Sequence, residues 1–257
     1  MTVNESRSGT PPERPHLEGA TLRPSGEAAI VVEYGDVIDW TFQSKGLALA
    51  EALATVRPAG LIEVVPTYRS VLIEFDPDET DPDALLAALP ERIDRSGADA
   101  GAATREWVVP VCVADDMAED AAEAAAVLGL SREEAVRRLL QSVMRVGMYG
   151  FAPGFAYLKG LDPALELPRR ATPRPPMPAG SIIIANGQAA IAPRPMPTGW
   201  YVMGRTPIRM FDPTRPGPGM VPFAIGDRLY LREVDRSEFD RLVASESGGL
   251  SRYEGGT

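Results

Sequence analysis

The chain has 257 residues, of which 44% are hydrophobic and 24% charged, a globular composition that allows one large domain or two modest ones. Its formal net charge of −10 and isoelectric point of about 4.8 argue against a general nucleic-acid binder. A single cysteine, Cys112, excludes an internal disulfide, and no apolar run is long enough to span a membrane. Because the N-terminus lacks the apolar core of a signal peptide, we expect a cytoplasmic protein.

The sequence contains one histidine, His16, within a polar and proline-rich stretch over residues 1–20 that we expect to be a disordered lead-in. Catalytic triads and Cys–His pairs need a histidine in a packed site, and zinc sites usually use His or several Cys. The sequence therefore predicts neither a histidine-dependent nucleophile nor a metal site.

After residue 20 the sequence predicts strands at 28–34, 61–65, 71–75 and 106–113, with helices at 44–56 and after Asp81-Pro82. Ser44 is the candidate N-cap of the first helix, and Asp81 followed by Pro82 is a typical start for the second. The order β-α-β-β-α-β is that of a ferredoxin-like α+β domain, over residues 21–103. Glycine and alanine at 97–103 form a candidate hinge, in which case the strand at 106–113 belongs to the next domain.

A second domain is expected over residues 104–235. Helices are predicted at 116–128, ending at Gly129, and from the capping box that Ser131 opens to about Leu140. From residue 143 onward, short apolar strands alternate with loops that hold 15 of the 25 prolines between residues 151 and 222, which indicates a β-barrel or sandwich. For residues 236–257 we expect a short amphipathic helix and a frayed tail.

Charge is distributed unevenly along the chain. Between residues 168 and 215 there are seven arginines and one acid, Asp212, so this segment carries +6 and the remainder −16. Guanidinium groups bind carboxylate and phosphate through forked hydrogen bonds, so the cluster predicts an anion-recognising face. Pairing of individual arginines with the acidic remainder is the alternative.

The stretch GFAPGFAYLKGL at 150–161 concentrates aromatic residues, proline and glycine in a short loop. Pro153 restricts the backbone there, and Gly154 permits conformations that other residues avoid. Phe155 and Tyr157 then stand as the walls of a site, or the phenylalanines fill the barrel interior. Trp200 has the same two interpretations.

Nine short motifs resemble one known family. They are GFAPGFAYL at 150–158, GLDP at 160–163, PRRATPR at 168–174, PAGS at 178–181, GW at 199–200, GRTP at 204–207 and GDR at 226–228, with EVVPTYRS at 63–70 and FDP at 75–77. Together they resemble the family that holds the B subunit of 5-oxoprolinase, allophanate hydrolase subunit 1 and the sporulation kinase inhibitor. The resemblance covers roughly residues 21 to 235. It implies a ferredoxin-like N-terminal domain followed by a mainly-β, cyclophilin-like barrel domain.

The resemblance implies a component of a heteromeric, ATP-dependent amide or lactam hydrolase of the 5-oxoprolinase or allophanate-hydrolase type, inactive alone. Its partner is expected to resemble the C subunit of 5-oxoprolinase or allophanate hydrolase subunit 2, and its substrate to be a small anion. The sequence has no GxxxxGK[ST] motif, so ATP is not expected in a P-loop. The alternatives are a non-catalytic regulator that inhibits a sensor histidine kinase and a paralogue with another small substrate.

By resemblance, a substrate site lies on the concave face of the barrel. The expected substrate-binding residues are Phe151, Pro153, Gly154, Phe155, Tyr157, Arg169, Arg174, Ser181, Gln188, Trp200, Arg205 and Thr206. Arg169, Arg174 and Arg205 are expected to hold a carboxylate or phosphate. Gln188 is expected to orient a carbonyl, and no catalytic acid or base is assigned.

The sequence departs from the family pattern in three places. RLLQ at 138–141 lacks a histidine that family members commonly carry, and VADD at 113–116 replaces a Tyr-Gly-Gly-Glu-like run. QAAIAP at 188–193 replaces Gln-Thr-Gly-Ile-Tyr-Pro, which removes a hydroxyl and a phenol. These changes indicate a divergent member, and they add weight to the regulator alternative.

Overall fold

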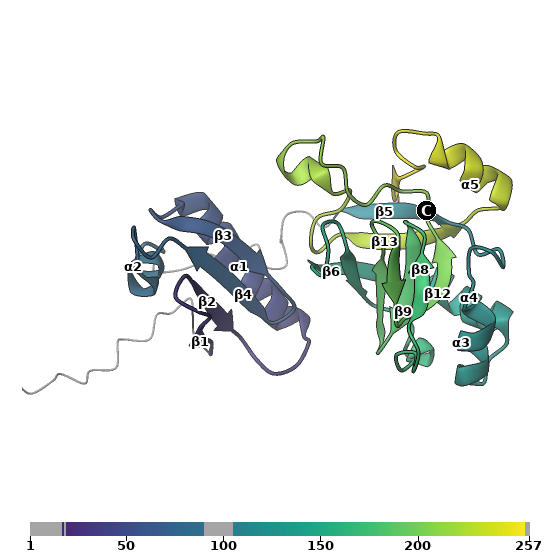
Figure 1. Cartoon of the computed structure of the whole chain (residues 1–257), viewed down its shortest axis with the longest axis horizontal. Coiled ribbons are helices and arrows are strands. Elements are labelled where there is room, and N and C mark those ends of the chain that lie inside the picture. Colours follow the sequence, from purple (N-terminus) through teal and green to yellow (C-terminus); the bar gives the residue numbers. More distant parts are fainter. Residues whose placement is uncertain (1–16, 18, 90–104, 255–257) are drawn as a thin grey trace, which may run out of the picture. The chain divides into compact units, whose positions relative to one another are not determined.

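The structure is a computed structural model that describes residues 17, 19–89 and 105–254. The chain divides into two compact units, Met1–Ala100 and Gly101–Thr257, which are described separately (Figure 1). His16, the candidate hinge at 97–103 and most of the lead-in lie outside the described residues. Leu17 is described and is buried in the core of the first unit, so the expected disorder does not extend to this residue.

The first unit contains a four-stranded antiparallel sheet in the order β1-β2-β4-β3. Its strands are β1 (Thr21–Pro24), β2 (Ala29–Glu33), β3 (Leu61–Pro66) and β4 (Ser70–Phe75), and its helices are α1 (Trp40–Val56) and α2 (Pro82–Ala87). Alternate residues of β2 and β4 are buried, as expected for a sheet with one covered face. Leu49 and Leu53 of α1 pack in the same core as Val71 and Ile73.

The order β2-β4-β3 corresponds to the first three strands of the expected ferredoxin-like pattern, but the fourth place is filled differently. The strand beside β2 is β1, which precedes it in sequence and is exposed at all four residues. The strand expected in this place begins at Glu106 and belongs to the second unit, where it pairs with another strand. Because β1 carries no apolar alternation, the sequence pattern did not reveal it.

Helix starts show where local sequence chemistry is decisive. Asp81 caps α2 by accepting a hydrogen bond from the Ala84 amide (2.8 Å), as predicted. The prediction for α1 is wrong, because the cap is Asp39, which accepts from the Thr41 amide (2.7 Å). Ser44 lies inside that helix and donates its hydroxyl to the Thr41 carbonyl (2.9 Å).

The second unit is built on an eight-stranded sheet in the order β12-β9-β10-β7-β6-β13-β5-β14. Its strands are β5 (Glu106–Val111), β6 (Met144–Tyr149), β7 (Ala156–Lys159), β9 (Ser181–Ala185), β10 (Gln188–Ile191), β12 (Tyr201–Arg205), β13 (Arg228–Glu233) and β14 (Ser251–Arg252). Cys112, directly after β5, exchanges two backbone hydrogen bonds with Arg205 of β12 (2.8 and 3.0 Å). This bridge joins distant strands of the sheet order, so the sheet curls into a barrel (Figure 1).

Both faces of this sheet are covered at β9, whose five residues are all buried. Ile182 and Ile184 belong to the largest core cluster, while Ile183 and Ala185 belong to a smaller cluster on the opposite face. A small sheet of β8 (Arg174–Met177) and β11 (Met196–Thr198) contributes Met177 and Met196 to that smaller cluster. Phe155 and Trp200, two of the predicted site residues, belong to this smaller cluster, and Tyr157 packs against it.

Helices α3 (Ala121–Leu128), α4 (Arg132–Gln141) and α5 (Arg236–Val243) complete the second unit. Gly129 ends α3 in the left-handed conformation, and the Ser131 hydroxyl accepts from the Glu134 amide (3.1 Å), both as predicted. The tail is not simply frayed, because β14 pairs with β5 and Tyr253 stacks on Tyr230 with ring centroids 3.9 Å apart. No helix of the described ranges has the length and apolar character needed to cross a bilayer.

Candidate functional site

Four aromatic rings form a continuous chain beside the 150–161 loop. Ring centroids are 5.4 Å apart for Phe151 and Phe155, 4.9 Å for Phe155 and Tyr157, and 6.1 Å for Tyr157 and Trp200. Phe155 and Trp200 are only 4% and 7% exposed, so they pack in the smaller core cluster. Phe151 is 78% exposed and Tyr157 is half-buried. The two interior rings therefore support an accessible aromatic surface made by Phe151 and Tyr157.

The backbone at Phe151 is held in an unfavourable conformation. Its φ of 66° lies in the left-handed region, and the Ala152 amide donates to the Gly150 carbonyl (2.7 Å), which closes a γ-turn on Phe151. A γ-turn with positive φ is rare and strained for a residue with a side chain. Strained residues of this kind cluster at ligand sites, where the surrounding structure over-determines them. The loop therefore presents a solvent-exposed ring from a tightly fixed backbone.

Gly154 has a backbone role in this loop. Its φ is 77°, and a Cβ atom there would lie 2.6 Å from both the Met210 carbonyl oxygen and the Phe211 Cβ. Glycine is thus required both by conformation and by the close approach of residues 210–211. Pro153 is exposed at the same turn. These two residues shape the turn that carries the rings, and the close approach of residues 210–211 leaves no space for a side chain at Gly154.

Tyr157 and Arg169 lie near each other at this surface. Burial raises the pKa of the Tyr157 phenol, and the positive charge of Arg169 partly opposes that shift. Arg169 is exposed and, among the described residues, forms no ion pair with a carboxylate. Of the three arginines predicted to hold an anion, Arg169 is therefore the one whose guanidinium is available to a ligand.

The other two predicted anion-binding arginines are paired with acids of the chain itself. Arg174 forms ion pairs with Glu119 and with Asp120 (2.7 Å), and Arg205 reaches Glu119 (3.4 Å). Arg170 joins the network through Asp120 (3.2 Å). For these arginines the structure thus shows the alternative interpretation, pairing with the acidic remainder, and we do not retain Arg174 and Arg205 as ligand-binding groups.

This network fastens the start of α3 to the barrel. The Asp120 carboxylate accepts from the Val202 amide of β12 (2.7 Å), and the Asp120 amide donates to the Val202 carbonyl (3.0 Å). Asp120 is 6% exposed, and its charge is compensated by Arg170 and Arg174. Residues 116–120, predicted as helical, instead form turns and a bend; α3 begins at Ala121, and the Asp120 carboxylate accepts from Val202 and does not cap the helix.

Two predicted hydroxyl ligands are buried and already bonded to backbone. The Ser181 hydroxyl donates to the Pro178 carbonyl (2.8 Å), and the Thr206 hydroxyl accepts from the Ile208 amide (3.3 Å). Both side chains are at most 2% exposed. They stabilise the turn before β9 and the turn after β12, and we do not retain them as ligand-binding groups. Gln188 begins β10 and is half-buried, so it stays in the candidate site.

A row of cations on the same sheet was not identified from the sequence. Arg228 of β13 lies opposite Arg145 of β6, and Arg145 lies opposite Lys159 of β7. These residues are far apart in sequence and share no motif, so only the strand register brings them together. Lys159 is two residues after Tyr157 on the same strand, and the two side chains therefore lie on one face of the sheet.

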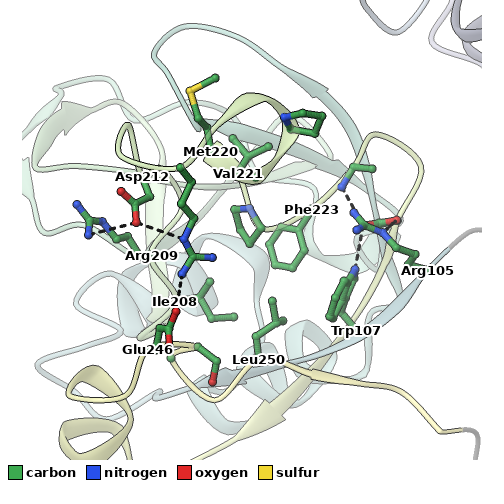
Figure 2. Close-up of a pocket in the computed structure, with 18 of the residues that line it drawn as sticks. Arg105, Trp107, Ile208, Arg209, Asp212, Met220, Val221, Phe223, Glu246 and Leu250 are labelled. Carbon is green, nitrogen blue, oxygen red and sulfur yellow. Dashed lines mark hydrogen bonds and ion pairs between the residues drawn. The ribbon is translucent and has the colours of Figure 1, made fainter. Parts of the chain in front are cut away.

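A separate cavity of about 1590 Å³ lies in the second unit between the 207–225 loop and residues 243–250. Figure 2 shows Ile208, Phe223 and Leu250 at its centre, between two sets of paired charges. On one side Asp227 accepts from Arg105 (2.6 Å) and from the Trp107 indole (2.9 Å).

On the other side of this cavity Arg215 bridges Asp212 (3.4 Å) and Glu246 (3.3 Å). None of the twelve predicted site residues, all of which are described, lines the cavity. The charged groups of the cavity are thus largely neutralised by one another, whereas the aromatic surface has Arg169 beside it. Within the described ranges, no three His, Cys, Asp or Glu side chains gather as a metal-ligand set.

Comparison with known proteins places the chain in a family. The family described as "Carboxyltransferase domain, subdomain C and D" matches residues 20–221. The chain belongs to this family. A protein from Bacillus subtilis (strain 168), named as the B subunit of 5-oxoprolinase, is 29% identical over 224 residues, which are 83% of this chain and 92% of that protein. A protein of the same name from Escherichia coli O157:H7 is 31% identical over 196 residues, 75% of this chain and 87% of that protein.

Solved structures give the same result at the level of fold. The crystal structure of TTHA0988 superposes with a TM-score of 0.69 at 32% identity, over 83% of this chain but only 40% of the TTHA0988 chain. The Kluyveromyces lactis urea amidolyase superposes with a TM-score of 0.64 at 18% identity, over 94% of this chain and 17% of that enzyme, and this likeness concerns the fold alone. The family membership expected from the sequence motifs is confirmed.

Proposed function

We propose that this chain is one component of a 5-oxoprolinase-type complex, an ATP-dependent hydrolase that opens the C–N bond of a small lactam. The observation that carries the proposal is similarity over most of the length of two proteins named as B subunits of 5-oxoprolinase. The described residues offer a binding surface, but motif and geometry identify no catalytic acid or base among them. The chain therefore acts with a protein that resembles the C subunit of 5-oxoprolinase, here called the C-type partner, and is inactive alone.

The aromatic surface suits a small, flat and anionic substrate. Phe151 and Tyr157 offer exposed and half-exposed ring faces, and rings of this kind pack well on a planar lactam. Arg169 supplies a positive charge beside Tyr157. Gln188 supplies an amide that can orient the lactam carbonyl by hydrogen bonding. In the proposed site, the interior rings of Phe155 and Trp200 keep Tyr157 in place.

The departures from the family pattern also bear on the proposed role. Ala189 faces the main core and Ala192 the smaller one, so methyl groups fill the two positions where a hydroxyl and a phenol were expected. The chain thus contributes substrate binding and orientation, and the groups that handle ATP and the reacting carbonyl come in part from the C-type partner. Any ATP that this chain contacts is not held by a P-loop, because the sequence has no GxxxxGK[ST] motif.

The proposal is tested by reconstituting the complex. Co-expression with the C-type partner should give a stable heteromer whose ATP hydrolysis is stimulated by 5-oxoproline, while neither chain alone responds. A stable heteromer with the same ATPase rate with and without 5-oxoproline, and with other carboxylated lactams, contradicts the proposal.

The regulator alternative stays a prediction. In that case the chain should bind the dimerisation domain of a sensor histidine kinase and lower its autophosphorylation. The same preparation would then show no lactam-dependent ATP use.

A further inference from the structure

The cavity of Figure 2 exposes a large apolar side chain on each of its two walls. On the wall formed by the 207–225 loop, Met220 is 36% exposed. On the wall formed by residues 243–250, Val243, the last residue of α5, is 56% exposed. Ile208 and Phe223, which also line the cavity, are buried. The two walls thus offer accessible apolar surface on both sides of a buried apolar centre.

The walls of this cavity are fixed by a hydrogen bond and by close backbone packing. The Tyr149 hydroxyl donates to the Phe223 carbonyl (3.0 Å). A Cβ atom at Gly248 would lie 2.8 Å from both the Ile208 Cα and the Pro207 carbonyl oxygen, so the two walls are in contact there. The cavity is therefore preformed, as small-molecule sites usually are.

The charged side chains that line the cavity are paired with one another. The lining holds three arginines and three carboxylates, so its net charge is zero. The pairs are Arg105 with Asp227 (2.6 Å), Arg209 with Asp212 (3.6 Å), and Arg215 with Asp212 (3.4 Å) and Glu246 (3.3 Å). An ion that entered the cavity would lose hydration without meeting a free counter-charge, which is unfavourable.

We infer that this cavity is a second binding site of the chain and takes a small, uncharged and mainly apolar molecule. Its volume of about 1590 Å³ exceeds the roughly 300–1,000 Å³ of most ligand pockets, so such a molecule has room. A bound molecule removes the exposed surface of Met220 and Val243 from water and leaves the ion pairs intact. The cavity shares no lining residue with the aromatic surface of Phe151 and Tyr157, and the inference does not rest on the proposed function.

Fluorescence titration of the full chain with N-phenyl-1-naphthylamine tests the inference. This probe is uncharged, and its emission rises in apolar surroundings. The wild-type chain should bind it, and Val243→Gln and Met220→Gln should each weaken binding at least about fivefold, because each removes apolar contact in the cavity. Both side chains are exposed, so neither change should disturb folding.

The control variant is Val127→Gln on α3. Val127 is 54% exposed and lies next to the end of its helix, much as Val243 does, but it does not line the cavity. Binding of the probe should therefore be unchanged in this variant. Arg169→Gln, on the aromatic surface, should also leave binding unchanged.

Competition at pH 7 tests the expected chemical class. Uncharged 1-naphthol should displace the probe, whereas naphthalene-1-sulfonate, which has the same rings and a negative charge, should need at least about a fivefold higher concentration. Equal displacement by the two competitors contradicts an uncharged ligand. The inference is also overturned if the wild-type chain does not bind the probe, if Val243→Gln and Met220→Gln bind it as tightly as the wild type, or if only Arg169→Gln weakens binding.

A segment of a partner protein is the other occupant that the experiment can reveal. If the C-type partner displaces the probe, and Val243→Gln but not Val127→Gln weakens the heteromer, the cavity is a protein docking site and the inference of a small-molecule ligand is wrong. A heteromer that binds the probe as tightly as the free chain supports the inference.

Discussion

At the residue scale, Phe151 combines a strained backbone with a side chain that is largely outside the core. Its ring is 78% exposed and contacts Phe155, while its φ of 66° belongs to a region that favours glycine. A residue held under such conditions contributes little to folding. A large exposed ring at this position is better explained by contact with a ligand or partner, in line with the proposed function.

Replacement of Phe151 separates these roles. Phe151→Gly relieves the positive φ and should leave the free energy of unfolding unchanged or raise it by about 1 kcal/mol. In the reconstituted complex the same variant should lower kcat/KM for 5-oxoproline at least about tenfold, because the exposed ring surface is lost. A large drop in stability with unchanged kcat/KM would instead show that the ring is a packing residue.

Gly154 and Gly187 form a matched pair for testing the loop. Both have positive φ, 77° and 65°, but a Cβ at Gly154 meets residues 210–211 at 2.6 Å, whereas nothing lies within 4 Å of one at Gly187. Gly187→Ala should therefore cost about 1 kcal/mol of unfolding free energy, and Gly154→Ala should cost at least about 2 kcal/mol. Equal losses in denaturant unfolding would show that the close approach is not rigid.

At the scale of elements, the start of α3 depends on one buried carboxylate. Asp120 compensates Arg170 and Arg174 and also accepts from the Val202 amide, so Asp120→Ala leaves several partners unsatisfied at once. We expect a loss of about 3 kcal/mol in urea unfolding. Glu123→Ala, which removes only a half-exposed partner of Arg170, should cost less than about 1 kcal/mol. Similar losses for both variants would mean that Asp120 does not hold α3 to β12.

The cap of α1 gives a prediction with a defined pH dependence. The hydrogen bonds that the Asp39 carboxylate receives from Thr41 lower its pKa below the ordinary range. Its stabilisation is therefore present above the pKa of the unfolded state and is lost as pH falls through the lower folded pKa. Asp39→Ala should lower the Tm at pH 6 more than Ser44→Ala does, and this difference should shrink toward pH 3. A pH-independent difference would contradict a charged cap.

Local sequence chemistry predicted the elements well wherever the determining residues are neighbours. The caps at Asp81 and Ser131 follow from residues within one helical turn. The strand β1 was missed because all four of its residues are exposed, and its pairing with β2 is set by tertiary structure. The N-cap of α1 was predicted at Ser44, but it is Asp39, and both residue types are suitable caps. The sequence pattern did not show that the helix begins before Ser44, at Trp40.

At the scale of the whole molecule, the aromatic residues of the predicted site lie together, whereas two of its three arginines are paired with acids of the chain. The rings at 151–157 are close in sequence, and the contact between Tyr157 and Trp200 brings a fourth ring beside them. The pairing of Arg174 with Asp120 joins residues 54 positions apart, so composition alone could not show that this arginine is neutralised. The position of Arg145 opposite Lys159 depends on the register of β6 and β7, which no sequence motif indicates.

The second unit therefore presents two candidate surfaces, and they differ in chemistry. The cavity of Figure 2 has an apolar centre and charges that mostly compensate each other. The sheet face at β6 and β7 combines exposed aromatic surface with a row of cations, two of them partly buried. Because a small anionic substrate needs both a ring contact and a positive charge, the sheet face is the expected binding surface.

Hydrogen–deuterium exchange on the reconstituted complex, with and without 5-oxoproline, tests this central claim most directly. The account predicts that the lactam slows exchange across residues 144–159, which include β6, the GFAPGF loop and β7, and that Phe151→Gly and Arg169→Gln weaken this protection. Protection confined to residues 207–225 and 243–250, with 144–159 unchanged, would place the ligand in the cavity of Figure 2 and contradict the account.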